Sequence, residues 1–386
     1  MILNLIFGGL FAFTKIPLIY SFWHLSMAFK QYFAILKVVF LTPGSHIMRI
    51  SITFLLTFFF LKTSFSQKNT YRNLVMEGGG IKGIAYGGAL LELEKKGILQ
   101  NITRVAGTSA GAIQACLLSV GYSPKEIIEI VNQTPIETFN DDGFVAKGTK
   151  RLIKEYGWFK GESFLKTMEN VIFQRTGNAN LTFEELHRLA EATPFRDLYV
   201  TGTNLTEQSL VIFSHETYPK MRIADAVRIS MSIPLYYKSI WIDQEGTVYE
   251  EPIANKKCNL FVDGGLMLNY PIDIFDKPKY MSNEGEKEIF NEQTIGLRLE
   301  KCTQIDHELA KKDGAAVQTI HDISSYMDAL GGLMMRNVNA PNKRDLERTI
   351  YINDNGLSAR VRKVPDNEKQ MMMMAGQQAV IEFFGR

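Results

Sequence analysis

Three separate stretches of the sequence carry residue types that together could break an acyl bond through a serine nucleophile. The first, Gly107-Thr-Ser-Ala-Gly111, places Ser109 between two glycines. A Gly-x-Ser-x-Gly pattern between a strand and a helix is typical of a nucleophile elbow, where a tight turn lifts the serine hydroxyl above a sheet. Only very small side chains fit at Gly107 and Gly111 in such a turn. The pentapeptide alone is a weak signal, because Gly, Ser and Ala also cluster in ordinary turns.

The second stretch is the glycine loop Gly78-Gly79-Gly80-Ile81-Lys82-Gly83. It follows a strand-like segment, 72–77, and precedes a segment with helical character, 84–96. Glycines leave backbone N–H groups unobstructed, and several such groups aimed at one point form an oxyanion hole. The loop therefore suits stabilisation of the negative charge that develops when a nucleophile attacks an acyl carbon.

The glycine loop also matches the Gly-x-Gly-x-x-Gly fingerprint of dinucleotide-binding proteins. That fold offers an acidic residue about 20 residues further on, for the ribose. Residues 101–121 contain no Asp or Glu, so this alternative is disfavoured. A phosphate-binding P-loop is disfavoured as well, because the Gly-Lys-Ser/Thr spacing is missing.

The third stretch, Asp263-Gly264-Gly265, ends an apolar strand-like run at 260–262. A serine hydroxyl needs a base, and Asp263 is the favoured candidate, with a plain turn as the alternative. A serine–acid–histidine order would require His307 or His321, but both lie in polar helical surroundings typical of surface histidines. A lone carboxylate is a weak base, so we expect Asp263 in a partly dry site that raises its pKa.

The elements that must position these residues alternate between strand and helix. This alternation predicts an α/β fold with a mostly parallel sheet that is covered on both faces. Capping boxes at Ser123–Glu126 and Thr182–Glu185 predict helix starts. Apolar runs predict strands at 102–106, 198–203, 209–213, 294–299 and 348–352, and helices at 112–120, 222–231, 306–338 and 366–384.

The composition is that of a globular protein, with 46% hydrophobic and 22% charged residues and a net charge of +2. A broad basic surface for nucleic acid is therefore not expected. Cys116, Cys258 and Cys302 form no Cys-x-x-Cys pair, so we expect no disulfide framework and no zinc site from them.

The N-terminal part of the chain differs from the rest. Residues 1–76 hold seven of the 43 basic residues and none of the 41 acidic ones. Residues 1–47 are apolar and basic. We interpret them either as a membrane segment or as the result of a start codon assigned too early, with translation beginning at Met48 instead. Residues 48–66 have the layout of a signal peptide, with a possible cut after Ser66. Residues 67–386 are expected to form the domain that carries the three stretches and their hydrolase chemistry. We expect the protein to be exported or membrane-associated through its first 66 residues, rather than cytoplasmic.

The glycine loop, the serine pentapeptide and Asp263-Gly264-Gly265 occur in the order of three signature blocks, and the chain resembles the patatin-like phospholipases. Residues 228–234 (Arg-Ile-Ser-Met-Ser-Ile-Pro) and 269–271 (Asn-Tyr-Pro) resemble further blocks of that family. The resemblance covers about residues 72–271. Lys82 departs from the arginine often found at its position but keeps the positive charge.

The resemblance implies a three-layer α/β/α sandwich and a Ser109–Asp263 dyad that needs neither metal nor cofactor. It implies oxyanion N–H groups from Gly79, Gly80 and Ile81. Membrane or micellar acyl lipids would be the substrates, while protein partners stay open. Two alternatives remain: a catalytically idle lipid-binding protein of the same fold, and a thioesterase or acyltransferase acting on another acyl substrate. The supporting motif residues are Gly78, Lys82, Gly83, Gly107, Gly111, Gly264 and Gly265.

Overall fold

The computed structural model describes residues 70–385, apart from 193, 282–289, 313, 324, 327–328, 331 and 334–341. The predictions for residues 1–47 and 48–66 therefore lie outside the described residues. Within the described part of the chain, no helix is both long enough and apolar enough to cross a membrane.

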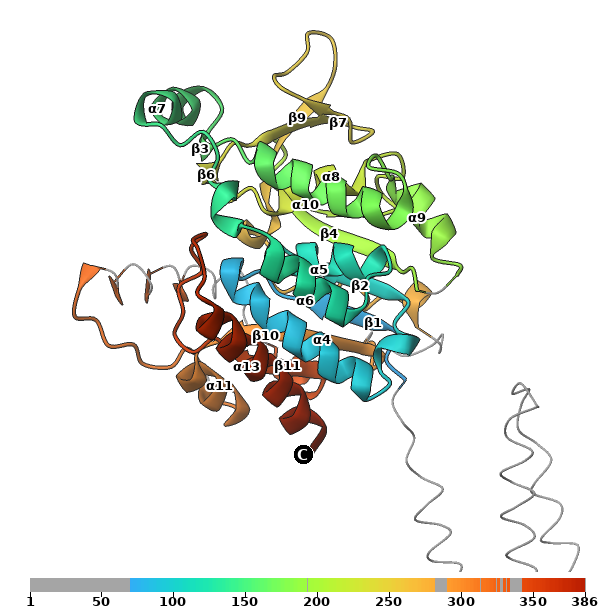
Figure 1. Ribbon diagram of the computed structural model, residues 1–386, viewed down its shortest axis with the longest axis vertical. Coiled ribbons are helices and arrows are strands. Elements are labelled where there is room, and N and C mark those ends of the chain that lie inside the picture. The colour runs from blue at the N-terminus through green and yellow to red at the C-terminus, as the bar shows by residue number, and fades with distance from the viewer. Residues whose placement is uncertain are drawn as a thin grey trace, which may run out of the picture. The chain divides into compact units, whose positions relative to one another are not determined.

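A nine-stranded sheet forms the centre of the fold, in the order β11-β10-β1-β2-β4-β9-β7-β8, with β5 paired to β4 (Figure 1). A separate pair joins β3 to β6. The strands are β1 (Asn73–Met76), β2 (Arg104–Gly107), β3 (Gly157–Phe159), β4 (Asp197–Asn204), β5 (Ser209–Phe213), β6 (Leu235–Tyr237), β7 (Ile240–Asp243), β8 (Val248–Tyr249), β9 (Cys258–Asp263), β10 (Thr294–Glu300) and β11 (Thr349–Asn353).

The strands from β11 to β4 in this order pair in parallel, which confirms the predicted mostly parallel α/β sandwich. The strands β5, β9, β7 and β8 are added in antiparallel orientation. Several helices lie in front of the sheet in Figure 1. The helices are α4 (Ala85–Lys95), α5 (Ala110–Ser119), α6 (Pro124–Gln133), α7 (Val145–Lys154), α8 (Glu162–Thr176), α9 (Phe183–Leu189), α10 (Ile223–Ser230), α11 (Cys302–Leu309) and α13 (Asp366–Gly385).

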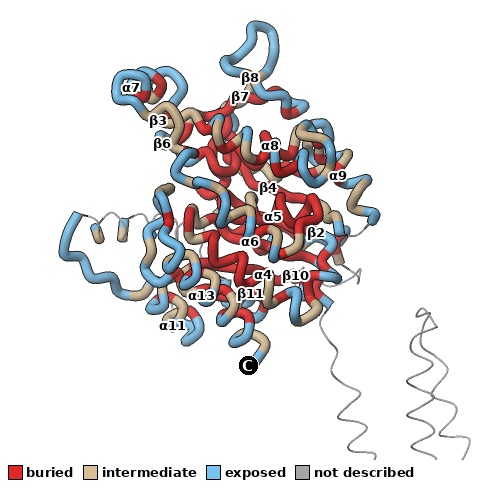
Figure 2. The backbone as a smooth tube through the Cα atoms, viewed as in Figure 1, coloured by how far each residue is buried: buried red, intermediate tan, exposed pale blue. Residues whose placement is uncertain are grey.

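Alternate residues of the central strands enter two different cores, because successive side chains of a strand point to opposite faces. In β1, Leu74 and Met76 face the helices, whereas Val75 faces the other side. That second core is closed by the segment after β9, including Tyr270 and Phe275. Figure 2 shows the buried backbone concentrated in the central strands and in α5, while α7 and the β7–β8 turn are largely exposed.

Most predicted elements are present, with ends shifted by a few residues. Both capping boxes form: Ser123 and Glu126 begin α6, and Thr182 and Glu185 begin α9. The prediction of one continuous helix at 306–338 is wrong, because α11 ends at Leu309 and the described residues are helical again only between 323 and 333. Lys311 and Gly314 then adopt positive φ angles, and residues 315–320 are irregular and mostly exposed. This segment buries no continuous apolar stripe, so nothing stabilises a helix there.

Candidate active site

Ser109 lies at the sharp turn between β2 and α5, as the nucleophile-elbow pattern predicts. Its backbone has φ 51° and ψ −119°, an unfavourable region for a residue with a side chain. The turn needs glycine on both sides of the serine. A Cβ at Gly107 would lie 2.3 Å from the carbonyl carbon of Gly111, and a Cβ at Gly111 would lie 2.2 Å from the Met76 oxygen. The close approach of three backbone segments therefore holds the serine in its strained conformation.

The register of the sheet brings Asp263 to the serine. Strand β2 pairs with the first half of β4, where Gly107 lies opposite Val200. Strand β9 pairs with the second half of the same edge, where Asp263 lies opposite Gly202. The last residue of β2 and the last residue of β9 therefore meet at neighbouring positions along β4. Ser109 follows two residues after Gly107 and reaches the aspartate.

The Ser109 hydroxyl donates a hydrogen bond to the Asp263 carboxylate. The backbone N–H of Gly265 donates a second one, at 2.7 Å. Only 8% of Ser109 and 6% of Asp263 are exposed. Burial raises the pKa of Asp263 to about 7, and the two hydrogen bonds offset that rise only in part. A carboxyl group with this pKa can both accept and return a proton near neutral pH.

Two further serines, for which the sequence predicts no role, hold the pair in place. The backbone N–H of Ser109 donates to Ser230 Oγ at 2.9 Å. The backbone N–H of Asp263 donates to the carbonyl of Ser232 at 2.9 Å. Both serines are fully buried and lie within the 228–234 block. Arg228, at the start of this block, is buried too and donates to the Gly161 carbonyl, which fixes the block against the start of α8.

The glycine loop lies over the elbow and continues into a short 3-10 helix, Gly80–Ile84. Within the described residues, the N–H groups of Gly79 and Gly80 have no hydrogen-bond partner. The N–H of Ile81 instead donates to the Ala359 carbonyl at 3.3 Å, so this predicted oxyanion donor is already engaged. Gly80 has φ +55°, and a Cβ there would lie 2.0 Å from the Ala359 oxygen. No other residue type fits at position 80 without displacing that segment.

The remaining predicted motif residues support the site through packing. Lys82 Nζ forms an ion pair with Asp354 Oδ2 at 2.5 Å, which ties the glycine loop to the segment after β11. A Cβ at Gly83 would lie 2.8 Å from the Ala110 Cβ, so this glycine allows the loop to touch α5.

The other glycines of the motifs make similar close approaches. Gly78 exchanges two hydrogen bonds with Asn269, each 3.0 Å long. A Cβ at Gly264 would lie 2.1 Å from Thr201 Oγ1, and a Cβ at Gly265 would lie 2.8 Å from Asn269 Oδ1. Asn269 therefore connects the glycine loop to the turn after Asp263.

An apolar pocket opens from Ser109 between α5, α6 and α8. It has a volume of about 900 Å³, including the space at its open mouth. Gln114 is an exception to the apolar lining: its side-chain oxygen is buried without a hydrogen-bond partner among the described residues. Representative lining residues are Ile113, Leu117, Ile130, Phe139, Met168 and Val171.

Neither of the histidines considered from the sequence lines this pocket. His307 lies in α11, and the His321 side chain is 72% exposed. Among the described residues, one group has the geometry of metal ligands, and it consists of His187, Asp197 and His215. Asp197 begins β4, whereas Ser109 follows the opposite end of the neighbouring strand, so this group is separate from the serine site.

The fold and the site define an α/β protein in which a nucleophile elbow faces a buried carboxylate at the mouth of an apolar pocket. The sequence profile of the patatin-like phospholipases matches residues 74–276, more than half of the chain. The chain therefore belongs to the patatin-like phospholipase family.

Two viral relatives align with more than half of the chain, and one solved structure is similar in fold. The uncharacterized protein R571 of Acanthamoeba polyphaga mimivirus is 28% identical over 295 residues, which is 75% of this chain and 85% of that protein. The probable lipid hydrolase 463L of Invertebrate iridescent virus 6 is 31% identical over 226 residues, which is 58% of this chain and 69% of that protein. The crystal structure of VipD from Legionella pneumophila is similar in fold, with a TM-score of 0.50 and 18% identity over 82% of this chain and 67% of that one.

Proposed function

We propose that the protein is a serine acyl hydrolase that cleaves ester bonds of phospholipids or other acyl lipids. The observation that carries the proposal is the hydrogen bond between Ser109 and the buried Asp263 at the mouth of an apolar pocket. Membership of the patatin-like phospholipase family supports a lipid substrate, as does the similarity to a viral protein named as a probable lipid hydrolase.

Acylation begins when Asp263 accepts the Ser109 proton while the Ser109 oxygen attacks the ester carbonyl carbon. The carbonyl oxygen becomes an oxyanion and accepts hydrogen bonds from the N–H groups of Gly79 and Gly80, which have no other partner among the described residues. The intermediate then expels the alcohol part of the lipid, which takes the proton from Asp263. In the second half, Asp263 accepts a proton from water while the water oxygen attacks the acyl-enzyme carbonyl carbon. The bond between the acyl carbon and Ser109 Oγ then breaks, Ser109 takes the proton back from Asp263, and the fatty acid is released.

The pocket suits the acyl chain of such a substrate. Its lining is almost entirely aliphatic and aromatic, and burying a methylene group there contributes about 0.8 kcal/mol. The helix α5 carries both Ser109 at its start and Ile113 and Leu117 on the pocket wall. A chain that lies along α5 would therefore present its carboxyl end to the serine.

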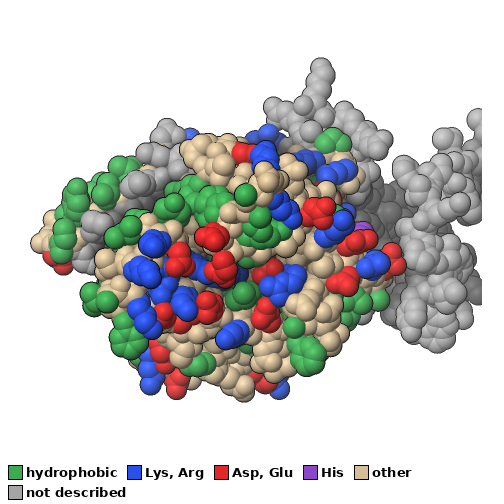
Figure 3. Space-filling model, turned by 90° about the horizontal axis from the view of Figure 1, so that it is seen from above, with side chains coloured by type: hydrophobic (Ala, Val, Ile, Leu, Met, Phe, Trp, Pro, Cys, Tyr) green, Lys and Arg blue, Asp and Glu red, His purple; other side chains and the backbone are tan. Residues whose placement is uncertain are grey.

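Exposed apolar side chains beside the pocket support access from a lipid surface. Ile233 lines the pocket, and the strand β6, which follows it, pairs with β3. Helix α7 packs against β3 and, with the preceding residue, exposes Phe144, Val145 and Ile153 by more than 70%. Seen from above, the molecule carries hydrophobic side chains gathered in places among mixed charges (Figure 3). Lipid interfaces bind surfaces that expose apolar and basic side chains, and α7 also exposes Lys147, Lys150 and Lys154.

We further propose that residues 1–66 direct the protein to export or to a membrane. The absence of acidic residues there and the uncharged run at 50–61 support this proposal. Mass spectrometry of the mature N-terminus tests it. A first residue at Gln67 is the expected result, whereas a chain that retains residues 1–47 would contradict the signal-peptide interpretation.

Free fatty acid release from mixed phospholipid vesicles tests the main proposal. The parent protein is compared with Ser109→Ala and Asp263→Asn, each with and without EDTA. Asp366→Asn serves as the control, since the Asp366 side chain is 94% exposed on α13. We expect release by the parent and the control only, with or without EDTA. Activity in Ser109→Ala would refute the nucleophile, and a folded but inactive parent would favour a non-lipid acyl substrate or a binding role.

A further inference from the structure

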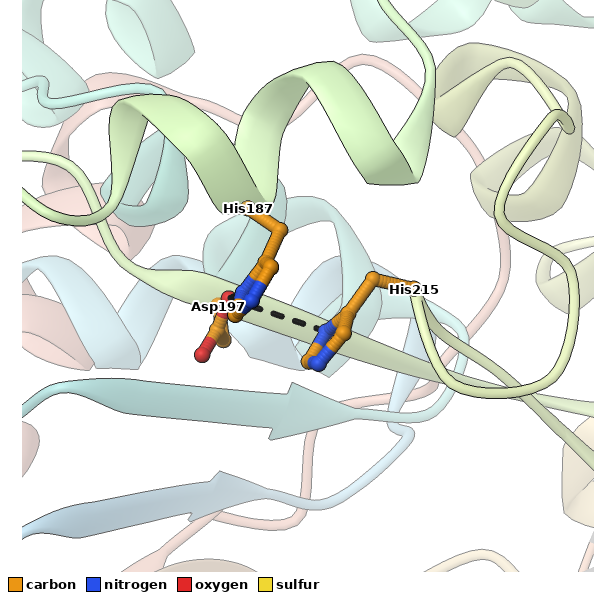
Figure 4. Close-up of side chains that lie close together, drawn as sticks. All are labelled: His187, Asp197 and His215. Carbon is orange, nitrogen blue, oxygen red and sulfur yellow. Dashed lines mark hydrogen bonds and ion pairs between the residues drawn. The ribbon is translucent and has the colours of Figure 1, made fainter.

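His187, Asp197 and His215 come together from three different elements at the end of the sheet away from the serine. His187 lies in the last turn of α9, Asp197 is the first residue of β4, and His215 follows β5 by two residues. Figure 4 shows the two imidazole rings side by side, with the carboxylate next to them. None of the three residues lines the acyl pocket.

Both imidazoles turn the same nitrogen atom toward one carboxylate oxygen. The distance from Asp197 Oδ1 to His187 Nδ1 is 2.6 Å, and the distance to His215 Nδ1 is 3.7 Å. The two rings are stacked, with centroids 3.8 Å apart and an interplanar angle of 5°. The ligand atoms of all three residues lie within 4.8 Å of one another. Two nitrogens and one oxygen thus surround a small common space.

We propose that His187, Asp197 and His215 bind one divalent transition-metal ion, with Zn²⁺ as the best match, through two Nδ1 atoms and one carboxylate oxygen. Imidazole and carboxylate groups are common Zn²⁺ ligands, with bonds of about 2.0–2.2 Å. Ligand atoms in a tetrahedral site with such bonds are about 3.3 Å apart. The two measured distances, 2.6 and 3.7 Å, lie on either side of this value.

Metal binding requires two small adjustments that the surroundings permit. The lone pair of an imidazole lies in the ring plane, so the two stacked rings must turn apart for both nitrogens to face one ion. The His187 side chain is 47% exposed, which leaves room for that rotation and for a water ligand. The proton that His187 now shares with the carboxylate must move to Nε2 or leave the ring. Asp197 keeps its place, because its N–H donates to the Thr103 carbonyl at 3.0 Å.

The charged groups beside the cluster leave its ligand atoms available. The neighbouring Glu216 carboxylate accepts hydrogen bonds from Tyr199, Tyr280 and Lys279, so its oxygens are held by other groups and Lys279 offsets its charge. Asp197 is therefore the carboxylate that would meet a cation between the two imidazoles.

The metal would connect α9, β4 and the segment after β5, and its role would be structural. Asp197 pairs with Arg104 at the start of β2, whereas Ser109 follows the end of that strand. The site is therefore independent of the proposed hydrolysis. Chelation should lower the thermal stability of the protein and leave fatty acid release intact at temperatures where the protein stays folded.

Titration of the metal-free full-length protein with Co²⁺, under reducing conditions, tests the proposal. Co²⁺ in a site of low coordination number gives strong visible absorption, and Zn²⁺ should bleach it by displacement. We expect one such Co²⁺ per chain in the parent and loss of the signal in His187→Gln, His215→Gln and Asp197→Asn. His321→Gln is the control, because His321 is an exposed histidine outside the cluster. Circular dichroism confirms that each variant is folded.

Thermal unfolding in the presence of Zn²⁺ gives a second measurement that does not depend on the visible absorption of Co²⁺. Zn²⁺ at a hundredfold excess over its dissociation constant should raise the Tm of the parent and of His321→Gln by several degrees, but not that of the three cluster variants. No saturable Co²⁺ signal in the parent, or equal signals in the parent and in folded cluster variants, would overturn the proposal.

Discussion

The backbone N–H of Ser109 donates a hydrogen bond to the side-chain oxygen of Ser230, 2.9 Å away and 121 residues later in the chain. Because Ser109 adopts a strained conformation, this bond helps to hold the nucleophile where its hydroxyl meets Asp263. The second contact of the same block, between the Asp263 N–H and the Ser232 carbonyl, holds the base. One short segment thus positions both members of the proposed dyad.

Ser230→Ala should reduce catalysis by more than its effect on stability explains. Loss of the buried acceptor leaves the Ser109 N–H unpaired, and we expect a cost of about 1 kcal/mol in the free energy of unfolding. Misplacement of the nucleophile should lower kcat roughly ten- to a hundredfold, with little change in KM. The control is Ser119→Ala, which loses a buried hydrogen bond to the Cys116 carbonyl on the same helix. Equal kcat values for the two variants would contradict this role of Ser230.

The activity should rise with pH through a single step near pH 7. The pKa of Asp263 is about 7 because burial raises it, and only the ionised carboxylate can accept the Ser109 proton. The value of kcat/KM should therefore be low at pH 5 and constant above about pH 8. A flat profile between pH 5 and 8, measured on a substrate without ionisable groups, would rule out Asp263 as the base with this pKa.

The stability of the protein should show the opposite dependence on pH. Above the unfolded pKa of Asp263, 3.8, the folded state binds more protons at this residue than the unfolded state does, so its contribution to stability falls as pH rises toward 7. In Asp263→Asn this residue no longer titrates, so the pH-dependent loss of stability disappears. The free energy of unfolding of the variant, relative to that of the parent, should therefore rise by up to a few kcal/mol between pH 4 and 8. Urea unfolding of both proteins measures the difference. The comparison cancels the contribution of Glu77, which also has a pKa of about 7 because of burial.

The ion pair between Lys82 and Asp354 should stabilise the glycine loop. The Asp354 side chain is 2% exposed, so Lys82→Ala leaves a buried carboxylate without its cation. We expect a cost of about 2 kcal/mol, between the values for surface and buried pairs, and recovery in Lys82→Arg. The exposed pair Lys220–Glu245 provides the control, since Lys220→Ala should cost almost nothing. The double variant Lys82→Ala/Asp354→Ala measures the coupling. If its loss in free energy of unfolding equals the sum of the losses in the two single variants, the two side chains do not interact.

Short-range signals in the sequence predict much of the fold and the centre of the site. The elbow at Ser109, the glycine loop and the two capping boxes depend on neighbours within a few residues, and all of them form. The position of Asp263 at the end of a strand is also predicted, but its strand β9 runs antiparallel to β4, which no local pattern indicates.

Contacts between distant segments could not be predicted in the same way. Ala359 accepts the hydrogen bond from the glycine loop through its backbone carbonyl, a group that every residue type has, so the sequence gives no sign of this contact. His187 and His215 are separated by 27 residues and belong to different elements, without the short spacing of a metal motif. The helix predicted at 306–338 is interrupted after α11, where Lys311 and Gly314 adopt positive φ angles that the helical character of the flanking residues does not indicate.

Binding to anionic lipid should depend on the basic residues of α7. Lys147, Lys150 and Lys154 are exposed on this helix beside Phe144 and Ile153. Each lysine near an anionic surface contributes about 1 kcal/mol, so replacing all three with glutamate should weaken binding to phosphatidylserine vesicles about a hundredfold or more. The matched control replaces three exposed lysines outside α7 with glutamate: Lys125, Lys166 and Lys311.

Vesicle co-sedimentation at low and high salt measures this difference, which should shrink as salt screens the charges. Hydrolysis of a soluble short-chain ester should be the same in the parent and both triple variants, because none of these lysines lines the pocket. Equal losses of binding in both triple variants would indicate a general effect of net charge and would contradict a docking role for α7. A specific loss in the α7 variant would place the mouth of the acyl pocket against the membrane, so that a lipid could reach Ser109 without crossing water.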